Sequence, residues 1–202
     1  MKKFITLVLA LCMALSASIC ASAAEVNTDG GSGSTPVYLS STEDGTLEGE
    51  PSATAMSVTV PTALPMAMSQ TGDVTTADNC QIINNSYGAV RVKSVNITTA
   101  NGWRLTSFGD KSTLASEKVD SNKLGFALSI GGGTQVMTDT SDESSQYLIS
   151  APIAGCYMSG SGNTSGNAVS VDYEAIVTPL SSAVTNANIA NVVFVIEWDT
   201  AA

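Results

Sequence analysis

The segment AVSVDYEAIV, residues 168–177, alternates apolar or small side chains with polar ones from Val169 to Ala175. Successive side chains of a β-strand point to opposite faces, so this period of two predicts a strand with one buried face. Asp172 and Glu174 would then lie on the face in solvent. The buried face would comprise Val169, Val171, Tyr173, Ala175 and Val177.

The segment NVVFVIEW, residues 191–198, repeats this pattern near the end of the chain. Its predicted buried face comprises Val192, Phe194, Ile196 and Trp198. Val193 and Val195 make the opposite face apolar as well at the start of the strand, before Glu197 and Asp199 make it polar. We therefore expect this strand to lie inside a sheet.

Shorter segments with the same period precede these two and are separated by Gly, Asn, Asp and Ser, which favour turns. They are residues 56–60, 64–68, 80–86, 89–98, 102–108, 123–130, 135–138 and 147–150. We expect residues 80–86 and 89–98 to pair with each other through a turn at 85–88. Helical periodicity is confined to a short stretch at residues 181–191. The pattern predicts an all-β fold, a single antiparallel β-sandwich of Greek-key or jelly-roll type with eight or nine strands, spanning residues 54–202.

The first 24 residues have the three parts of a secretory signal peptide. Lys2 and Lys3 are followed by the apolar residues 4–15, which are too few to span a bilayer, and by the small residues 21–24. Residues 25–53 are acidic, rich in Gly, Ser and Thr and poor in large apolar side chains, so we expect a flexible leader. Its one apolar run, PVYLS at residues 36–40, would form a strand only at a sheet edge.

The chain carries 8 basic and 18 acidic residues and no histidine, for a net charge of −10. This balance disfavours nucleic acid and anionic membrane surfaces as partners. The absence of histidine excludes Ser-His-Asp and Cys-His catalysis and the HExxH metal helix. We expect no catalytic residues and no cofactor. Paired carboxylates are the remaining route to catalysis, as in a glycosidase, and the candidates are Asp172, Glu174, Glu197 and Asp199.

Two further sets of residues have alternative interpretations. Asp139, Asp142 and Glu143 supply enough oxygen atoms for calcium but lack the spacing of a calcium-binding loop, so we expect a solvated loop and no metal. Removal of the signal peptide leaves two cysteines, Cys80 and Cys156. They either pair as a disulfide in an oxidising compartment or remain as two buried thiols.

The stretch NGWRLTS, residues 101–107, together with SVTVP, DNCQIINNS and VFVIEW, resembles the WxL surface domains of Gram-positive bacteria. That resemblance implies noncovalent binding to peptidoglycan, with Trp103 and Leu105 as the first Trp-x-Leu motif. Trp198 stands where the second motif would end, but Asp199 and Thr200 follow it instead of leucine. Trp103, Leu105 and Trp198 are therefore the candidate ligand-binding residues, and the alternative is that Trp103 and Leu105 are core residues of a strand.

The layout of the chain is similar to the secreted matrix-fibre proteins of the camelysin type, and that similarity implies that a leader segment of one subunit completes the sheet of the next. We expect a secreted, non-catalytic structural or adhesive protein, extracellular or noncovalently bound to the cell wall. Its partners would be a cell-wall polymer, or copies of itself through an exposed sheet edge, with no membrane anchor in the mature form. The alternatives are a glycan-binding module and, third, a carboxylate-dependent glycosidase.

Overall fold

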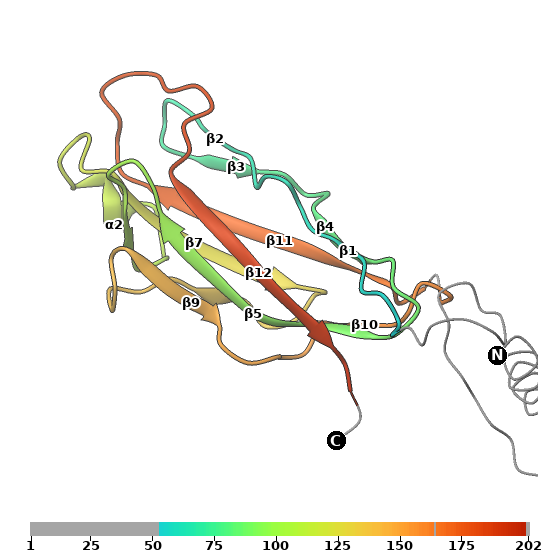
Figure 1. Ribbon diagram of the computed structural model, residues 1–202. Helices are drawn as coiled ribbons and strands as arrows, with labels where there is room; N and C mark the ends of the chain where they lie inside the picture. Colours follow the sequence, from blue (N-terminus) through green and yellow to red (C-terminus); the bar gives the residue numbers. More distant parts are fainter. Residues whose placement is uncertain (1–52, 164, 201–202) are drawn as a thin grey trace, which may run out of the picture. The chain divides into compact units, whose positions relative to one another are not determined.

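The computed structural model describes residues 53–163 and 165–200 (Figure 1). The predicted signal peptide, residues 1–24, and the leader up to residue 52 lie outside the described residues. The chain divides into two units between Ala53 and Thr54, and the unit from Thr54 onward carries the fold described below. Across residues 53–163 and 165–200, no helix has the length and hydrophobicity needed to span a membrane.

The described residues form twelve strands and one helical turn, α2 (Ser112–Ala115). The strands are β1 (Val58–Thr59), β2 (Met66–Met68), β3 (Val74–Thr76), β4 (Gln81–Asn84), β5 (Val90–Thr99), β6 (Arg104–Thr106), β7 (Lys123–Ile130), β8 (Val136–Met137), β9 (Ser145–Ile149), β10 (Tyr157–Met158), β11 (Ala168–Val177) and β12 (Ala190–Trp198). The number exceeds the predicted eight or nine because several strands have only two or three residues. The stretch at residues 181–189, with its helical periodicity, forms turns and bends instead of a helix.

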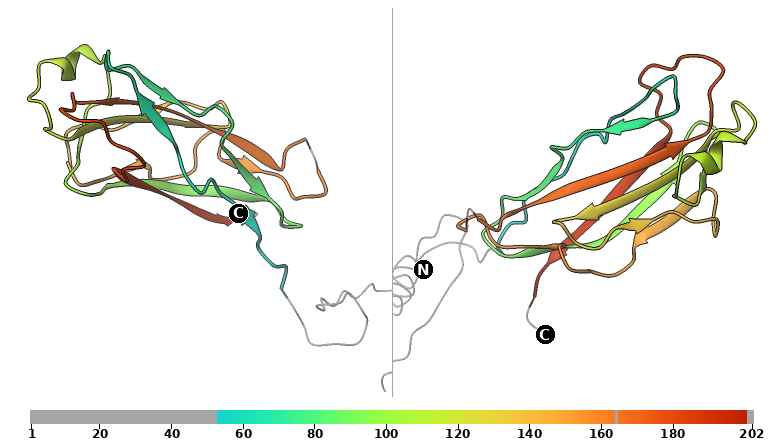
Figure 2. Two further views of the ribbon diagram at one scale, coloured as in Figure 1. Left: turned by 90° about the horizontal axis from the view of Figure 1, so that it is seen from above. Right: turned by 180° about the vertical axis from the view of Figure 1, so that it is seen from behind.

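Two sheets form the two layers of a sandwich (Figure 2). The larger sheet has six strands in the order β1-β4-β11-β7-β6, with β8 also paired to β7. In the smaller sheet, β5 pairs with β12 along one side and with β9 and β10 along the other. All these pairs are antiparallel except β6 with β7. The predicted all-β sandwich is confirmed.

The core lies between the sheets and is built mainly by three long strands, β5, β7 and β11. The register of β5 against β12 shifts opposite Val195 and Ile196, so that β5 contains a bulge at Lys93. Because of the bulge, Val92 and Val95 both point into the core although three positions separate them. The aliphatic residues with 0% exposure are Ile82, Val90, Val92, Val95, Ile97, Leu124, Ala127, Leu128 and Val171.

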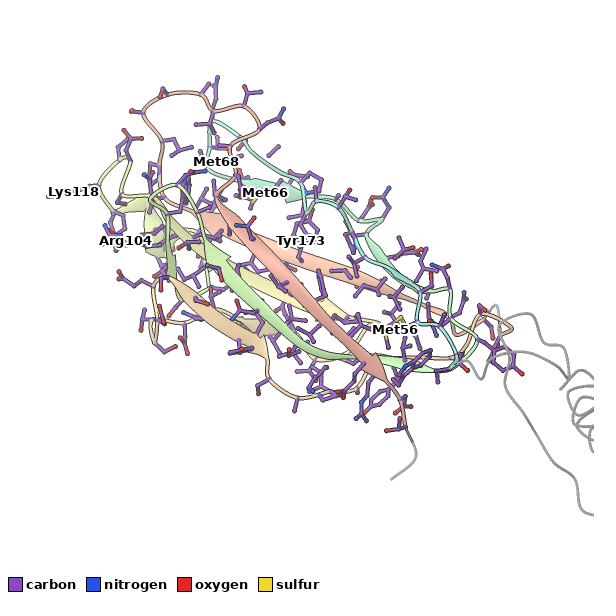
Figure 3. The ribbon with its side chains drawn as sticks, viewed as in Figure 1. Met56, Met66, Met68, Arg104, Lys118 and Tyr173 are labelled. Atoms are coloured by element: carbon purple, nitrogen blue, oxygen red, sulfur yellow. The ribbon has the colours of Figure 1, made fainter. Side chains whose placement is uncertain are left out.

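The hairpin of β2 and β3 forms a separate two-stranded sheet that contacts β11. Met66 and Met68 lie on this hairpin, and Tyr173 of β11 lies close by (Figure 3). The Tyr173 side chain is 3% exposed and stacks on Phe126, with ring centroids 6.0 Å apart. The hairpin is therefore joined to the core through β11.

The predicted pairing of residues 80–86 with residues 89–98 is wrong. β4 pairs with β1 and β11 in the larger sheet, whereas β5 is the centre of the smaller sheet. The chain crosses between the layers here, and the buried Asn84 fixes the crossing. Its side-chain amide donates to the carbonyl oxygens of Gly88 at 2.9 Å and Ser159 at 2.8 Å.

The predicted position of the last strand inside a sheet is also wrong. β12 pairs with β5 along one side, and no other strand among the described residues pairs with it. Val193 and Val195, which make its second face apolar, are 52% and 41% exposed. An apolar second face indicates burial only if another layer covers it, and no described element does so here.

Candidate interaction site at the edge of the small sheet

One side of β12 has no partner strand among residues 53–163 and 165–200. The carbonyl of Ile189 accepts a bond of 2.9 Å from Ala100, and the N–H of Asp199 donates one of 3.0 Å to Ala89, so both groups point toward β5. In an antiparallel ladder the N–H and C=O of one residue point to the same side, and this side alternates along the strand. The odd-numbered residues of β12 therefore bond β5. The even-numbered ones point outward and form what we call the free edge of β12.

The free edge lacks the features that usually block strand addition. Edge strands are commonly short, bulged, or interrupted by proline or lysine. β12 has nine residues, contains no proline or lysine, and pairs as a regular strand against the bulge of β5. The other edge strands are shorter: β1 has two residues and is followed closely by Pro61, β6 has three and includes Arg104, and β9 has five.

Charges near β12 are confined to its end. Glu197 accepts from the side chain of Arg91 at 2.8 Å and lies 3.1 Å from the ammonium of Lys93. Asp199 lies 3.4 Å from Arg91. Hydrogen bonding to Lys93 and Arg91 lowers the pKa of Glu197, and the bond to Glu197 raises the pKa of Arg91. The middle of the strand is uncharged, and the charges at its end are already paired within the chain.

The three candidate ligand-binding residues do not form one site. Leu105 is 1% exposed in the core, and Trp103, just before β6, packs against the core and donates its backbone N–H to Ala100. Ala100 in turn bonds Ile189, so Trp103 lies near the start of β12. Trp198 ends β12, and nine extended residues span about 30 Å. Trp103 and Trp198 are thus near opposite ends of the strand.

The four candidate carboxylates lie on different sheets. Asp172 and Glu174 are exposed on β11 of the larger sheet, whereas Glu197 and Asp199 lie at the end of β12 in the smaller sheet. The two pairs do not face each other across a cleft. Asp172 and Glu174 instead line a hollow of about 210 Å³ together with Thr76, Ala77, Asp78, Ser129, Gln135 and Tyr173. This lining is largely polar and has one aromatic ring.

The acidic loop after β8 uses its carboxylates to hold its own backbone. One oxygen of Asp142 accepts from the N–H and hydroxyl of Ser144, each at 2.7 Å, and from the N–H of Ser145 at 3.2 Å. Asp139 accepts from the N–H of Ser141, and Glu143 lies 3.7 Å from Arg104. These bonds lower the pKa values of Asp139 and Asp142. Among the residues that the structure describes, no group of three such side chains is arranged to hold a metal ion.

Cys80 and Cys156 are free thiols in the structure, so the disulfide alternative is not realised in it. Cys156 is fully buried next to β10, and burial raises its pKa. Cys80 is half-buried before β4, where its carbonyl accepts from Val171. Both side chains pack with the hydrophobic core.

Comparison of the chain with protein-family models, curated proteins and solved structures gave no match.

The free edge of β12 is the feature that sequence reasoning missed. The sequence does carry one signal for it, because β12 has no charged residue before Glu197 on either face. That pattern fits a strand covered on both faces and an edge strand with an exposed apolar face equally well.

Proposed function

We propose that this chain is a secreted, non-catalytic structural or adhesive protein of a Gram-positive cell surface or extracellular matrix. In this proposal it assembles with another protein chain of that surface or matrix, which adds a β-strand at the free edge of β12. Strand addition gains affinity from main-chain hydrogen bonds and specificity from side chains on alternate positions. The export signal predicted for residues 1–24 and the resemblances to WxL domains and camelysin-type proteins support the location.

The observation that carries the proposal is the edge of the nine-residue strand β12, which no other strand in the described part of the chain pairs with or covers. A long, flat, apolar edge is a template for pairing with another chain, and proteins that do not use such an edge usually disrupt it. The spread of the candidate carboxylates over two sheets supports a binding role over a catalytic one.

Retention at the cell surface tests the proposal. Cells that produce the chain with V193E and V195E should release it into the medium, because the two glutamates would need desolvation beside an incoming strand. The control is V119E with V184E, which changes two valines that are 54% and 57% exposed and lie outside the strands. Both variants add the same charge. The proposal is wrong if the β12 variant folds and is retained as well as the control.

A noncovalent glycan-binding module remains the second candidate, supported by exposed tyrosines. Tyr147 on β9 and Tyr157 on β10 are 69% and 48% exposed, and Tyr87 is 86% exposed. Tyr147 lies opposite Asn96 and Tyr157 opposite Arg91, so both flank β5. Aromatic rings with one free face offer an apolar surface with a polar end.

Binding to purified cell wall separates the two candidates. If tyrosines bind the glycan, Y147A with Y157A should abolish co-sedimentation with wall, and V193E with V195E should not affect it. The opposite result would favour strand addition. W103A adds a third arm: loss of binding with an intact fold would restore the WxL-type interpretation, whereas unfolding would make Trp103 a core residue.

A further inference from the structure

We infer that the strand received at the free edge of β12 is β12 of a second copy of this chain, in an antiparallel, two-fold symmetric pair centred on Phe194. The inference rests on the proposed function, because it names the partner for the same edge. It would join two four-stranded sheets into one continuous sheet of eight strands.

The centre follows from the length of the strand. In an antiparallel pair of identical strands related by a two-fold axis, residues at equal distances from the centre lie opposite each other. Phe194 is the middle residue of β12, which runs from Ala190 to Trp198. Centring on Phe194 is therefore the register in which every residue of the strand is paired.

The outward backbone groups match in this register. Phe194 belongs to the free edge, so its N–H and C=O can exchange two hydrogen bonds with Phe194 of the second copy. The other even-numbered residues also fall opposite each other, Val192 with Ile196 and Ala190 with Trp198. The groups that β12 leaves toward solvent thus satisfy one another without a change of strand geometry.

The exposed valines meet in the same register. Val193 falls opposite Val195 of the second copy, and the reverse pair forms by symmetry. Both are non-hydrogen-bonded positions of the new ladder, where Cα atoms are closest and side chains touch. These residues are 52% and 41% exposed in the single chain, and four such valines would form one apolar cluster at the centre of the joined sheet.

The charges of the strand do not oppose the pairing. Glu197 falls opposite Asn191 of the second copy, so no like charges meet directly. Glu197 is also held by Arg91 and Lys93 of its own chain. A second copy sets exposed valine against exposed valine and brings no like charges face to face, which favours it over a partner whose side chains are not matched to this edge.

Charge-swapped variants test both the partner and the register. Sedimentation of the purified full chain over a dilution series should show a monomer–dimer equilibrium. V193E with V195E places glutamates opposite each other twice, and V193K with V195K does the same with lysines. Each should weaken dimerisation at least about tenfold. A mixture of these two variants should regain dimers, because glutamates then face lysines. A single chain with V193K and V195E should also dimerise. This second result requires position 193 to face position 195, as it does only in the register centred on Phe194.

The control V119E with V184E should dimerise as the wild-type chain does, and circular dichroism should show that all variants fold. The inference is overturned if the wild-type chain stays monomeric at the highest attainable concentration. It is also overturned if V193E with V195E has no effect, or if mixing fails to restore dimers. The inference is also wrong if the chain forms open-ended oligomers and these disappear when residues 25–52 are removed. That result would identify the leader as the added strand. One outcome separates this inference from the proposed function. If the wild-type chain is monomeric but V193E with V195E still causes release from cells, this inference is wrong and the proposed function stands.

Discussion

The hydroxyl of Tyr173 lies 2.5 Å from the carbonyl oxygen of Pro65 and 3.2 Å from the amide nitrogen of Ala77. It donates to the first and accepts from the second. Pro65 immediately precedes β2 and Ala77 immediately follows β3, so one side chain on β11 holds both ends of the β2–β3 hairpin. Its ring meanwhile stacks on Phe126 in the core.

Replacing Tyr173 with phenylalanine should therefore loosen the hairpin. Y173F keeps the ring but leaves the carbonyl of Pro65 and the N–H of Ala77 without their partner, which should cost about 1–3 kcal/mol of unfolding free energy. Urea denaturation measures the loss of stability. Y173F should also speed up amide hydrogen exchange, relative to the wild-type chain, more at Ala77 than in β5. Y87F is the matched control because Tyr87 is 86% exposed. Equal stability of Y173F and Y87F would contradict the clamp.

The ion pairs of Glu197 predict a loss of stability in acid. Lys93 and Arg91 hold the pKa of Glu197 below its ordinary value of 4.5 in the folded chain. The unfolded chain takes up the proton first as the pH falls, so stability decreases below pH 4.5 until the folded-state pKa is passed. E197Q has no such titration.

Urea denaturation over a pH series should show this difference. The wild-type chain should be more stable than E197Q above pH 4.5, and its advantage should shrink on acidification. Asp139 and Asp142, whose pKa values are also lowered, keep part of the acid sensitivity in both proteins. A difference that stays constant over the series would show that the carboxylate of Glu197 titrates alike in the folded and unfolded chains.

The acidic loop should be stabilised by Asp142 itself and not by calcium. D142A removes the acceptor for three hydrogen bonds from Ser144 and Ser145, so its melting temperature should fall. D172A is the control, since Asp172 accepts only from the hydroxyl of Ser170. Calcium should leave the melting temperature of the wild-type chain unchanged. A rise on calcium addition that D142A abolishes would restore the calcium hypothesis.

Local pattern was sufficient to predict the long strands but not their neighbours in the sheets. The alternation of β11 and β12 is visible within ten residues because it reflects the geometry of an extended chain. The assignment of β4 and β5 to different sheets depends on Asn84, whose amide bonds Ser159, a residue 75 positions later. Short strands such as β10, with two residues, exist only through their pairing with β5 and have no period to detect.

The candidate site was harder to predict for the same reason. The spacing of Trp103 and Leu105 is typical of residues on one face of a strand, and Leu105 indeed lies in the core. Nothing in the sequence places Trp103 near the start of β12, at the end of the strand opposite Trp198. Likewise, whether Val193 and Val195 are covered depends on the order of the strands, and strand order is a property of contacts distant in sequence.

Gly88 should be required for the position of Trp198. A Cβ atom at residue 88 would lie 2.9 Å from ring carbon Cζ3 of Trp198 and 3.4 Å from Cε3, so the ring covers the glycine closely. G88A should displace this ring, which packs against the core at the end of β12, and overpacking of this kind costs about 1–3 kcal/mol.

The displacement can be followed by fluorescence in a W103F background, where Trp198 is the sole tryptophan. G88A should shift its emission toward longer wavelength as the ring gains solvent, and should lower the unfolding free energy. G109A is the control, because a Cβ atom there meets no heavy atom within 4 Å. Should G88A and G109A share both emission and stability, Trp198 would not be held against Gly88. The end of β12 would then be fixed by its ladder with Val90 and by the ion pairs of Glu197.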